Sequence, residues 1–298
     1  MTEFLQSLVN GFGQGSIYAL LALGFVMIYK ATKVISFAQP ALMIIGGLFT
    51  YHFTREFNLP FWVALSLAIL CGALVGMLVE RLALRPMVGK PVFTLAIITI
   101  GLDIVLRIVA NRYIGSQSRI VEYPNGGERY SLLGVSISQQ RLGLIAVTAV
   151  TVVALALFFR HSRAGLAMRA TAIDQETALA QGIRVGAIFA LAWAIAGGLA
   201  AIAGTFVAAG AAGLDQNTWT IALKALPAII IGGLDSVPGA VVGGLLVGIV
   251  ESVTAVYQPT FAPWLGTNFS LVVPYALMFL VLLVRPYGLF GTPEVERV

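Results

Sequence analysis

Residues 187–209 read AIFALAWAIAGGLAAIAGTFVAA, an apolar run without a single Asp, Glu, Lys or Arg. A helix needs about 20 mostly apolar residues to cross the hydrocarbon core of a bilayer, so this run predicts a transmembrane helix. Similar runs occupy 8–29, 37–53, 61–79, 91–110, 142–159, 218–232, 238–256 and 269–284. Several are interrupted by Gly or Pro, and 218–232 is short. We therefore predict an all-α, polytopic bundle of eight or nine transmembrane helices, forming one membrane domain over residues 1–298.

The composition of the whole chain agrees with a membrane protein. Hydrophobic residues make up 59% of it and charged residues only 10%, with a mean hydropathy of +0.93. Soluble chains carry roughly 45–50% apolar and about 25% charged residues. A water-soluble fold of this composition would expose large apolar patches and aggregate. A soluble enzyme, a nucleic-acid binder and a disordered scaffold are all disfavoured, and the lipid bilayer is the expected surrounding.

The basic residues predict the orientation of the chain, because cytoplasmic loops are enriched in Lys and Arg. With the N-terminus outside, four basic residues lie in outer segments and eleven in inner ones. The inner residues are Lys30, Lys33, Arg81, Arg85, Lys90, Arg160, Arg163, Arg169, Arg184, Arg285 and Arg297. The start, Met1-Thr2-Glu3-Phe4, has no basic region typical of a signal peptide, so the first helix is expected to be retained. We predict an outside N-terminus and a cytoplasmic C-terminus.

Two hydrophilic stretches are longer than simple turns. The outer one, at about 111–141, contains Asn125-Gly126-Gly127, which predicts the turn of a hairpin. The inner one, at about 160–186, contains Thr171 and Asp174 at the spacing of a capping box. Together with Gly182 as the residue after the helix end, this predicts one short helix of about ten residues.

Two interpretations of that inner helix stay open. Ala170, Ile173, Thr177 and Ala180 would form a narrow face of small residues. This face suits either insertion into a groove of a partner protein or an amphipathic connector that rests on the membrane surface.

Glycines four residues apart recur at Gly11–Gly15, Gly239–Gly243 and Gly244–Gly248. Small residues at this spacing let helix backbones approach closely in lipid. They indicate either packing within the chain or a dimer seam.

Four charged residues fall inside predicted spans, where ionisable groups are candidates for function. Asp103 and Arg107 are four apart on one helix and can pair on one face. Lys224 and Glu251 are candidates for a pair between neighbouring helices. The chain lacks the denser set of carboxylates typical of a carrier coupled to ions, which weighs against that mechanism.

Familiar catalytic motifs are missing from the sequence. The Gly-Lys pair at Gly89-Lys90 is followed by Pro91, so the chain has no P-loop for ATP. His52 and His161 fall near opposite ends of the predicted bundle, and Cys71 is the one cysteine, which makes a His/Cys metal site improbable. We expect no catalytic residue, no metal and no cofactor in this chain.

The stretch 163–183, RAGLAMRATAIDQETALAQGI, resembles the coupling loop of ABC importer permeases. Their pattern is Glu-Ala-Ala, three residues, then Gly; here it is Glu176-Thr177-Ala178, three residues, then Gly182. Thr177 departs from the pattern, and the downstream Ile-x-Leu-Pro of the classical importers is absent. The lead-in and the Gly-Ile pair resemble instead the LivH-type permeases of branched-chain amino acid importers. Residues 10–20, 33–40, 225–240 and 283–291 are similar to the same family.

The resemblance implies a permease subunit in the bacterial inner membrane. Its partners would be a second, related permease, two ATP-binding subunits and a periplasmic solute-binding protein, with ATP bound by those subunits and not by this chain. The resemblance implies branched-chain or other hydrophobic amino acids as substrates, with urea, amides or another small polar solute as the alternative. The residues that would couple to the ATPases are Arg163, Gly165, Arg169, Asp174, Glu176, Thr177 and Gly182.

Candidates for the translocation path lie where Pro-containing breaks enter the membrane. They are Ser36, Gln39 and Pro40, with Pro227 as their counterpart in the second half of the chain, whereas Pro259 is expected in an outer loop. A helix that begins at Gln39 would offer N–H groups to a carboxylate. Two rivals stay open: a secondary carrier that needs no ATP, and a membrane enzyme or scaffold.

Overall fold

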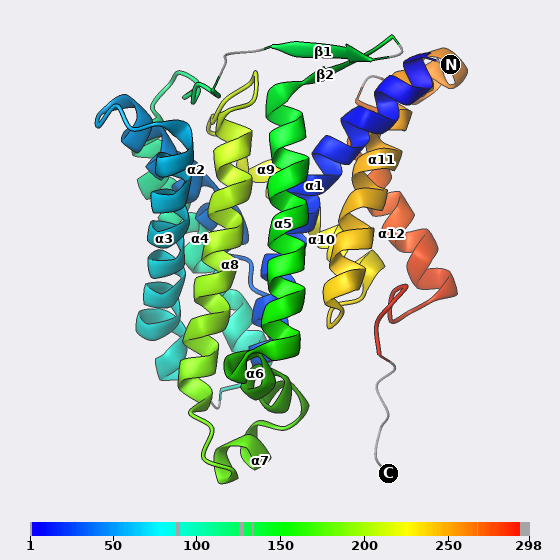
Figure 1. Ribbon diagram of the computed structural model, residues 1–298. Helices are drawn as coiled ribbons and strands as arrows, with labels where there is room; N and C mark the ends of the chain where they lie inside the picture. Colours follow the sequence, from blue (N-terminus) through cyan, green and yellow to red (C-terminus); the bar gives the residue numbers. More distant parts are fainter. Residues whose placement is uncertain (1, 88–89, 125–127, 133, 267, 293–298) are drawn as a thin grey trace.

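The computed structural model describes residues 2–87, 90–124, 128–132, 134–266 and 268–292, and nearly all the long elements in it are helices along one common axis (Figure 1). The long helices are α1 (Thr2–Thr32), α2 (Gln39–Arg55), α3 (Phe61–Val79), α4 (Val92–Ile114), α5 (Gln139–His161), α8 (Val185–Ala208) and α11 (Val237–Phe261). The shorter ones are α6 (Arg163–Ile173), α7 (Gln175–Ala180), α9 (Trp219–Leu223), α10 (Ala225–Gly232) and α12 (Val273–Val284). A π-helical turn follows α3 at Glu80–Leu84, and 3-10 turns occupy Arg85–Met87, Pro263–Leu265 and Phe269–Leu271.

All nine apolar runs predicted as spans contain helix. Six helices of the described part are long and apolar enough to cross a membrane: Thr2–Thr32, Phe61–Met87, Phe93–Ile114, Gln139–His161, Val185–Ala208 and Val237–Phe261. The other three runs are shorter helices, namely α2 with 17 residues, α9 with α10, and α12 with 12 residues.

Two boundaries differ from the sequence prediction. The run 218–232 is divided at Lys224 into the short helices α9 and α10, although Lys224 itself keeps a right-handed helical backbone. The placement of Pro259 in an outer loop is wrong, since α11 continues through it to Phe261. Proline removes one backbone N–H donor and displaces one carbonyl, and α11 accepts this loss in its last turn.

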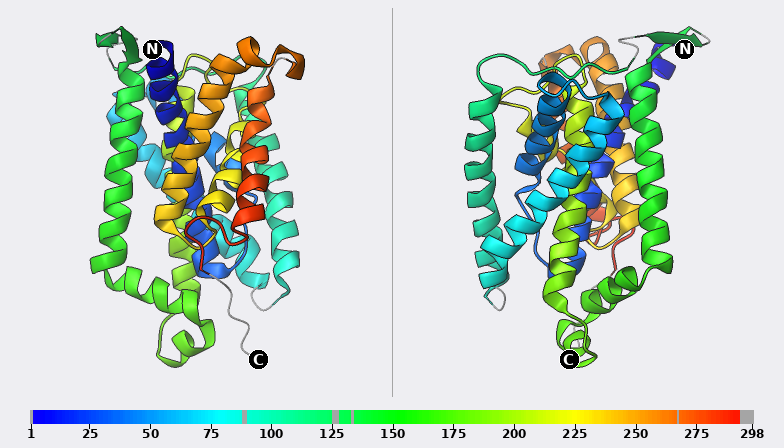
Figure 2. Two further views of the ribbon diagram at one scale, coloured as in Figure 1. Left: turned by 90° about the vertical axis from the view of Figure 1, so that its right-hand side faces the viewer. Right: turned by 60° about the vertical axis from the view of Figure 1, so that its left-hand side comes forward.

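The centre of the bundle is built by α1 and α8. The apolar window of α1 is 89% buried and that of α8 is 72% buried, whereas those of α4 and α5 are only 17% buried. Helix α1 packs against α11 and α8, and α8 is covered on its other side by α2 and α3. Figure 2 shows α4 and α5 standing at the periphery. Many of their apolar side chains are exposed, among them Ile108 of α4 and Val150 of α5.

The repeated glycines pack helices of this chain against each other. A Cβ atom added to Gly15 would lie 2.8 Å from the Cα of Leu245, and one added to Gly11 would lie 2.6 Å from the Cα of Ile249. Gly248 faces Gly11 and Gly15 across the same seam between α1 and α11. Such close backbone approach is what small residues provide in lipid, where packing drives helix association. The interpretation as packing within the chain is therefore confirmed.

A two-stranded hairpin covers the end of the bundle at which α1 begins (Figure 1). Its strands are β1 (Arg129–Leu132) and β2 (Val135–Ser138), paired antiparallel with Leu132 opposite Val135. The side chain of Gln6 exchanges two hydrogen bonds with the backbone of Ser136, which ties the hairpin to α1. The predicted turn at Asn125-Gly126-Gly127 lies outside the described residues, and the observed turn contains Gly134 with a φ of 79°.

Candidate functional site

At the opposite end of the bundle, α6 and α7 form a protruding pair of short helices, here called the α6–α7 segment (Arg163–Gly182) (Figure 1). The prediction of one helix capped by Thr171 is wrong. Thr171 is buried inside α6, and its hydroxyl donates to the carbonyl of Ala167. The break falls at Asp174, whose backbone is extended and whose carboxylate accepts from the N–H groups of Glu176 and Thr177 at 2.9 and 3.0 Å. Aspartate competes with the helix in this way and begins a new one.

The end of α7 follows the sequence prediction for Gly182. The N–H of Gly182 donates to the carbonyl of Leu179, and that of Ile183 donates to the carbonyl of Ala178. This is a Schellman motif, whose first residue after the helix needs a left-handed backbone. Gly182 supplies it with a φ of 82° and no neighbouring atom in contact, so glycine is required by the backbone alone.

The start of the α6–α7 segment is fixed to α5. Ser162 caps α6 by accepting from the N–H of Gly165 at 2.8 Å. A Cβ added to Gly165 would lie 2.9 Å from the Cα of Phe159, so glycine lets α6 fold back closely on α5. The guanidinium of Arg169 donates to the carbonyl of Phe159. Four of the seven predicted coupling residues (Gly165, Arg169, Asp174 and Gly182) thus have structural reasons for their identity.

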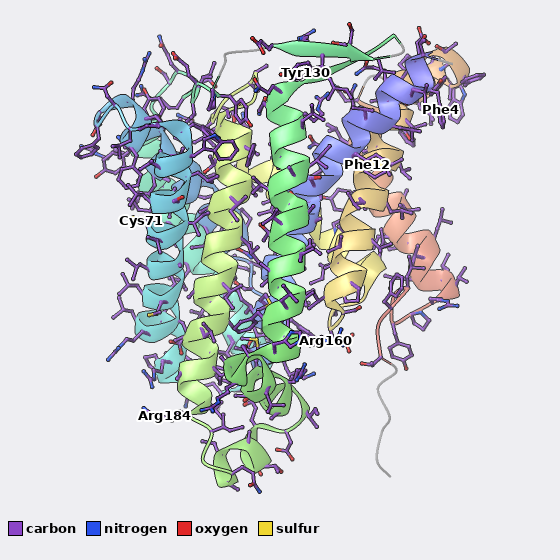
Figure 3. The ribbon with its side chains drawn as sticks, viewed as in Figure 1. Phe4, Phe12, Cys71, Tyr130, Arg160 and Arg184 are labelled. Carbon is purple, nitrogen blue, oxygen red and sulfur yellow. The ribbon has the colours of Figure 1, made fainter. Side chains whose placement is uncertain are left out.

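The outer surface of the segment is apolar as well as charged. Ile173 is 88% exposed, and Leu166 and Leu179 are also exposed, while Ala178 is buried against the bundle. The predicted small-residue face of Ala170, Ile173, Thr177 and Ala180 does not exist as one face, because its residues lie on two helices. Figure 3 shows Arg160, at the end of α5, and Arg184, ahead of α8, on this same end of the molecule.

The break before α2 is buried at the edge of the core. Ser36, Gln39 and Pro40 are all buried, and a Cβ on Gly24 of α1 would collide with the Gln39 amide. Among the described residues neither polar atom of Gln39 has a hydrogen-bond partner. Pro227 lies in α10, which packs on α11, α1 and α12, whereas α2 packs on α8, α3 and α4. The two helices share α1 and α9 as neighbours.

Two N–H groups around the start of α2 have partners in α4. The N–H of Ala41 donates to the Asp103 carboxylate at 3.0 Å, and that of Phe37 donates to the Thr99 hydroxyl at 3.0 Å. Asp103 also pairs with Arg107 at 2.7 Å, so the predicted pair on one helix is confirmed. The Arg107 guanidinium in turn lies 4.3 Å from the ring centroid of Trp219 in α9. The carboxylate that this helix start binds is thus one of the chain's own.

The second pair of membrane charges is also brought together. Lys224, at the junction of α9 and α10, forms an ion pair with Glu251 of α11. The Tyr18 hydroxyl donates to the other Glu251 oxygen at 2.6 Å, and the Gln14 amide donates to the Tyr18 oxygen at 2.9 Å. Sequence reasoning missed Gln14 and Tyr18. Their spacing of four, which places both on one face of a predicted membrane helix, was the available signal.

A cavity of about 1020 Å³ opens at the hairpin end of the bundle, next to this network. Gln14, Arg141 and Phe206 are among the residues that line it, together with Tyr123 of the connection between α4 and α5. Burial raises the pKa of the Tyr123 hydroxyl above its ordinary value. The described residues contain no group of three His, Cys, Asp or Glu side chains that could hold a metal ion.

Comparison with known proteins matches almost the whole chain. The sequence model of the family described as "Branched-chain amino acid transport system / permease component" matches residues 7–282. The high-affinity branched-chain amino acid transport system permease protein LivH of Escherichia coli K12 is 33% identical, over 99% of this chain and 98% of the relative. The corresponding protein BraD of Pseudomonas aeruginosa is 32% identical, with the same coverage of both chains.

A more distant relative is named for a sugar. The galactofuranose transporter permease protein YtfT of Escherichia coli K12 is 30% identical over 78% of this chain and 65% of the relative. All three relatives are named as permease proteins. With the family match over residues 7–282 and near-complete coverage by LivH and BraD, the chain belongs to the family of permease components of branched-chain amino acid transport systems.

Proposed function

We propose that this chain is a membrane-spanning permease subunit of a binding-protein-dependent ABC importer in the bacterial inner membrane. It moves branched-chain or other hydrophobic amino acids, driven by ATP hydrolysis on separate subunits. The observation that carries the proposal is the α6–α7 segment, a capped pair of helices that projects from the end of the bundle opposite the hairpin. The family match and the names of the relatives supply the substrate class.

The proposed coupling rests on how firmly the α6–α7 segment is attached. Because α6 is fixed to α5 through Gly165 and Arg169, movement of α7 is transmitted to the bundle rather than absorbed by a loose connection. A groove on the ATPase would receive α7 with its exposed Glu176 and Leu179. Nucleotide binding drives transport only if the ATPase binds two states of the permease with different free energies.

The proposed topology has the N-terminus and the hairpin outside, the α6–α7 segment and the C-terminus in the cytoplasm, and eight or nine spans. It is supported by Arg160, Arg163, Arg169 and Arg184, which gather at the α6–α7 end, as cytoplasmic segments of membrane proteins do. The cavity of about 1020 Å³ at the hairpin end would then face a periplasmic solute-binding protein. The helices α4 and α5 stand at opposite edges of the bundle (Figure 2), and a second, related permease would cover the apolar face of one of them.

The proposed path passes the break before α2, with Ser36, Gln39 and Pro40 from one half of the chain and Pro227 from the other. The buried amide of Gln39 supports this, because it has no partner among the described residues and is free to bind a polar group of a solute. The pairs Asp103–Arg107 and Lys224–Glu251 are proposed to hold helices together, not to bind a coupling ion.

The test is gentle purification of this chain from its native membrane, followed by uptake measurements in vesicles. We expect a second permease and two P-loop ATPases to co-purify, and leucine uptake to require both ATP and the solute-binding protein. ATP-independent uptake by the chain alone would refute the proposal and favour a secondary carrier. ATP-dependent uptake of a sugar, urea or an amide in place of leucine would retain the importer and correct the substrate.

Two variants test the coupling role, Gly182→Pro and Glu176→Lys. Both should abolish ATP-driven uptake and leave membrane insertion intact, because they alter the end and the surface of α7. Glu3→Lys, at an exposed position at the other end of the bundle, is the matched charge reversal and should keep its ATPase partners. Normal uptake in both α7 variants would refute the coupling role.

A further inference from the structure

Glu80 is an unpaired carboxylate buried inside the bundle. It begins the π-helical turn Glu80–Leu84 that follows α3, and it is only 1% exposed. Both of its carboxylate oxygens lack a hydrogen-bond partner among the described residues, and neither Arg81 nor Arg85 forms an ion pair with it. π-Helical turns are uncommon and occur often at functional sites.

A packing role alone does not account for this group. Taking a carboxylate out of water costs several kcal/mol unless a counter-charge or hydrogen bonds compensate it. The other buried carboxylates of this chain behave as expected, since Asp103 pairs with Arg107 and Glu251 pairs with Lys224. Glu80 differs from both in lacking such a partner within the described residues.

Glu80 is one of the residues that border a cavity of about 240 Å³ between α1, α4, α7 and α8. Leu95, Phe189 and Trp193 supply apolar walls, and Thr99 adds a hydroxyl. The exposed Lys90 also borders the cavity. Drug-sized ligands occupy cavities of about 300–1,000 Å³, so this one suits a smaller solute.

The cavity connects two regions that the proposed function already uses. Thr99 both borders it and accepts from the N–H of Phe37, directly before α2. Gln175, the first residue of α7, borders it on the other side. The cavity therefore lies between the break before α2 and the α6–α7 segment.

We propose that this cavity binds a small apolar primary amine, and that Glu80 accepts the ammonium group of the transported amino acid there. The ammonium would pair with the carboxylate and lie near the ring of Trp193, an arrangement that aromatic side chains favour for cations. The aliphatic side chain would pack on Leu95 and Phe189, and Lys90 would attract the carboxylate of the amino acid. The assignment of the amine to a transported amino acid rests on the proposed function. The cavity and the unpaired Glu80 are observed independently of that function.

The experiment measures binding to the full-length chain with its partner subunits in lipid nanodiscs. Trp62, Trp219 and Trp264 are replaced with Phe, so that Trp193 is the one tryptophan left in this chain. The Trp193 signal is the difference in fluorescence between complexes that contain Trp193 and complexes in which it too is replaced with Phe. The probes are L-leucine, isoamylamine, which lacks the carboxylate, and isocaproate, which lacks the amine. We expect leucine and isoamylamine to change the Trp193 signal saturably, and isocaproate to leave it unchanged.

Glu80→Gln should weaken isoamylamine binding about ten- to hundredfold, the range expected for losing a charge-assisted hydrogen bond. Glu80→Asp should restore part of it, and the exposed Glu128→Gln is the matched control that should bind as the unmodified chain does. Absence of any amine response in the unmodified chain would overturn the proposal without reference to a variant. Equal amine binding by Glu80→Gln would overturn it as well.

Leucine uptake by the same complexes separates this proposal from the function on which it rests. In one outcome, a complex binds isoamylamine in a Glu80-dependent way and yet takes up no amino acid. This result would retain the amine site and refute the proposal that the complex transports amino acids. ATP-driven leucine uptake without any amine response at Trp193 would retain the importer and refute the site.

Discussion

Removing one partner of the Lys224–Glu251 pair should destabilise the protein far more than removing both. The two side chains are only 13% and 11% exposed, so a single substitution leaves the other charge buried without a counter-ion. The cost of that is about 3–5 kcal/mol. We expect Glu251→Gln and Lys224→Met each to lower the free energy of unfolding by about this amount. The double variant should lose much less, because replacing a buried pair with uncharged groups is often close to neutral.

The Tyr18 hydroxyl sharpens the prediction, since it donates to the same carboxylate at 2.6 Å. Tyr18→Phe removes one hydrogen bond to a charged group and should cost about 1.5–3 kcal/mol. In the Glu251→Gln background the same change should cost less, because the acceptor is then neutral.

The assay is reversible unfolding of the purified chain in mixed micelles, monitored by its tryptophan fluorescence. We expect a coupling energy of at least about 3 kcal/mol between Lys224 and Glu251 in the double-mutant cycle. Arg55 and Glu122 provide the control cycle, because they lie 3.9 Å apart with side chains 68% and 88% exposed. That exposed pair should couple by less than about 1 kcal/mol. Strictly additive costs for Lys224 and Glu251 would refute the argument that burial makes them interdependent.

Three further changes test other contacts. Gly15→Leu should prevent stable packing of α1 on α11 and reduce the yield of monodisperse protein. Gly101→Leu is the control, because an added Cβ there has no atom within 4 Å, and it should leave the yield unchanged. Equal yields of the two variants would contradict the packing argument. Asp174→Ala should lower ATP-driven uptake by loosening α7, because losing an N-cap residue costs about 0.5–2 kcal/mol of helix stability. Unchanged uptake would show that coupling does not depend on this cap. Asp103→Asn should lower the unfolding midpoint, because the N–H of Ala41 loses a charged acceptor; an unchanged midpoint would show that the contact contributes little.

Local sequence was sufficient wherever a property depends on neighbours along the chain. The apolar run at 187–209 predicted α8 because length and hydrophobicity alone decide whether a segment can span a bilayer. Gly182 was predicted as the residue that ends a helix because its role depends on a backbone angle, not on distant contacts. The pair Asp103–Arg107 followed from a spacing of four on one helix.

Other local predictions failed because two signals competed. Thr171 and Asp174 both suit a helix start, and only the tertiary packing of α6 buries Thr171 and leaves Asp174 to begin α7. Pro259 was placed in a loop because the apolar run was predicted to end at residue 256, yet α11 continues through it to Phe261. In both places the helix boundary was decided by a choice between two locally acceptable positions.

The sequence alone determined that this chain is a helical membrane protein with the family pattern of a permease, because composition, span length and short motifs are all local. Only the tertiary structure decided which polar groups meet. Gln14 and Tyr18 join Lys224 and Glu251 across α1, α11 and the junction of α9 and α10, and Glu80 stands apart without a partner in the described residues. The physical reason is that pairing in the membrane depends on helix neighbours distant in sequence, and these are set by which small residues let two backbones approach.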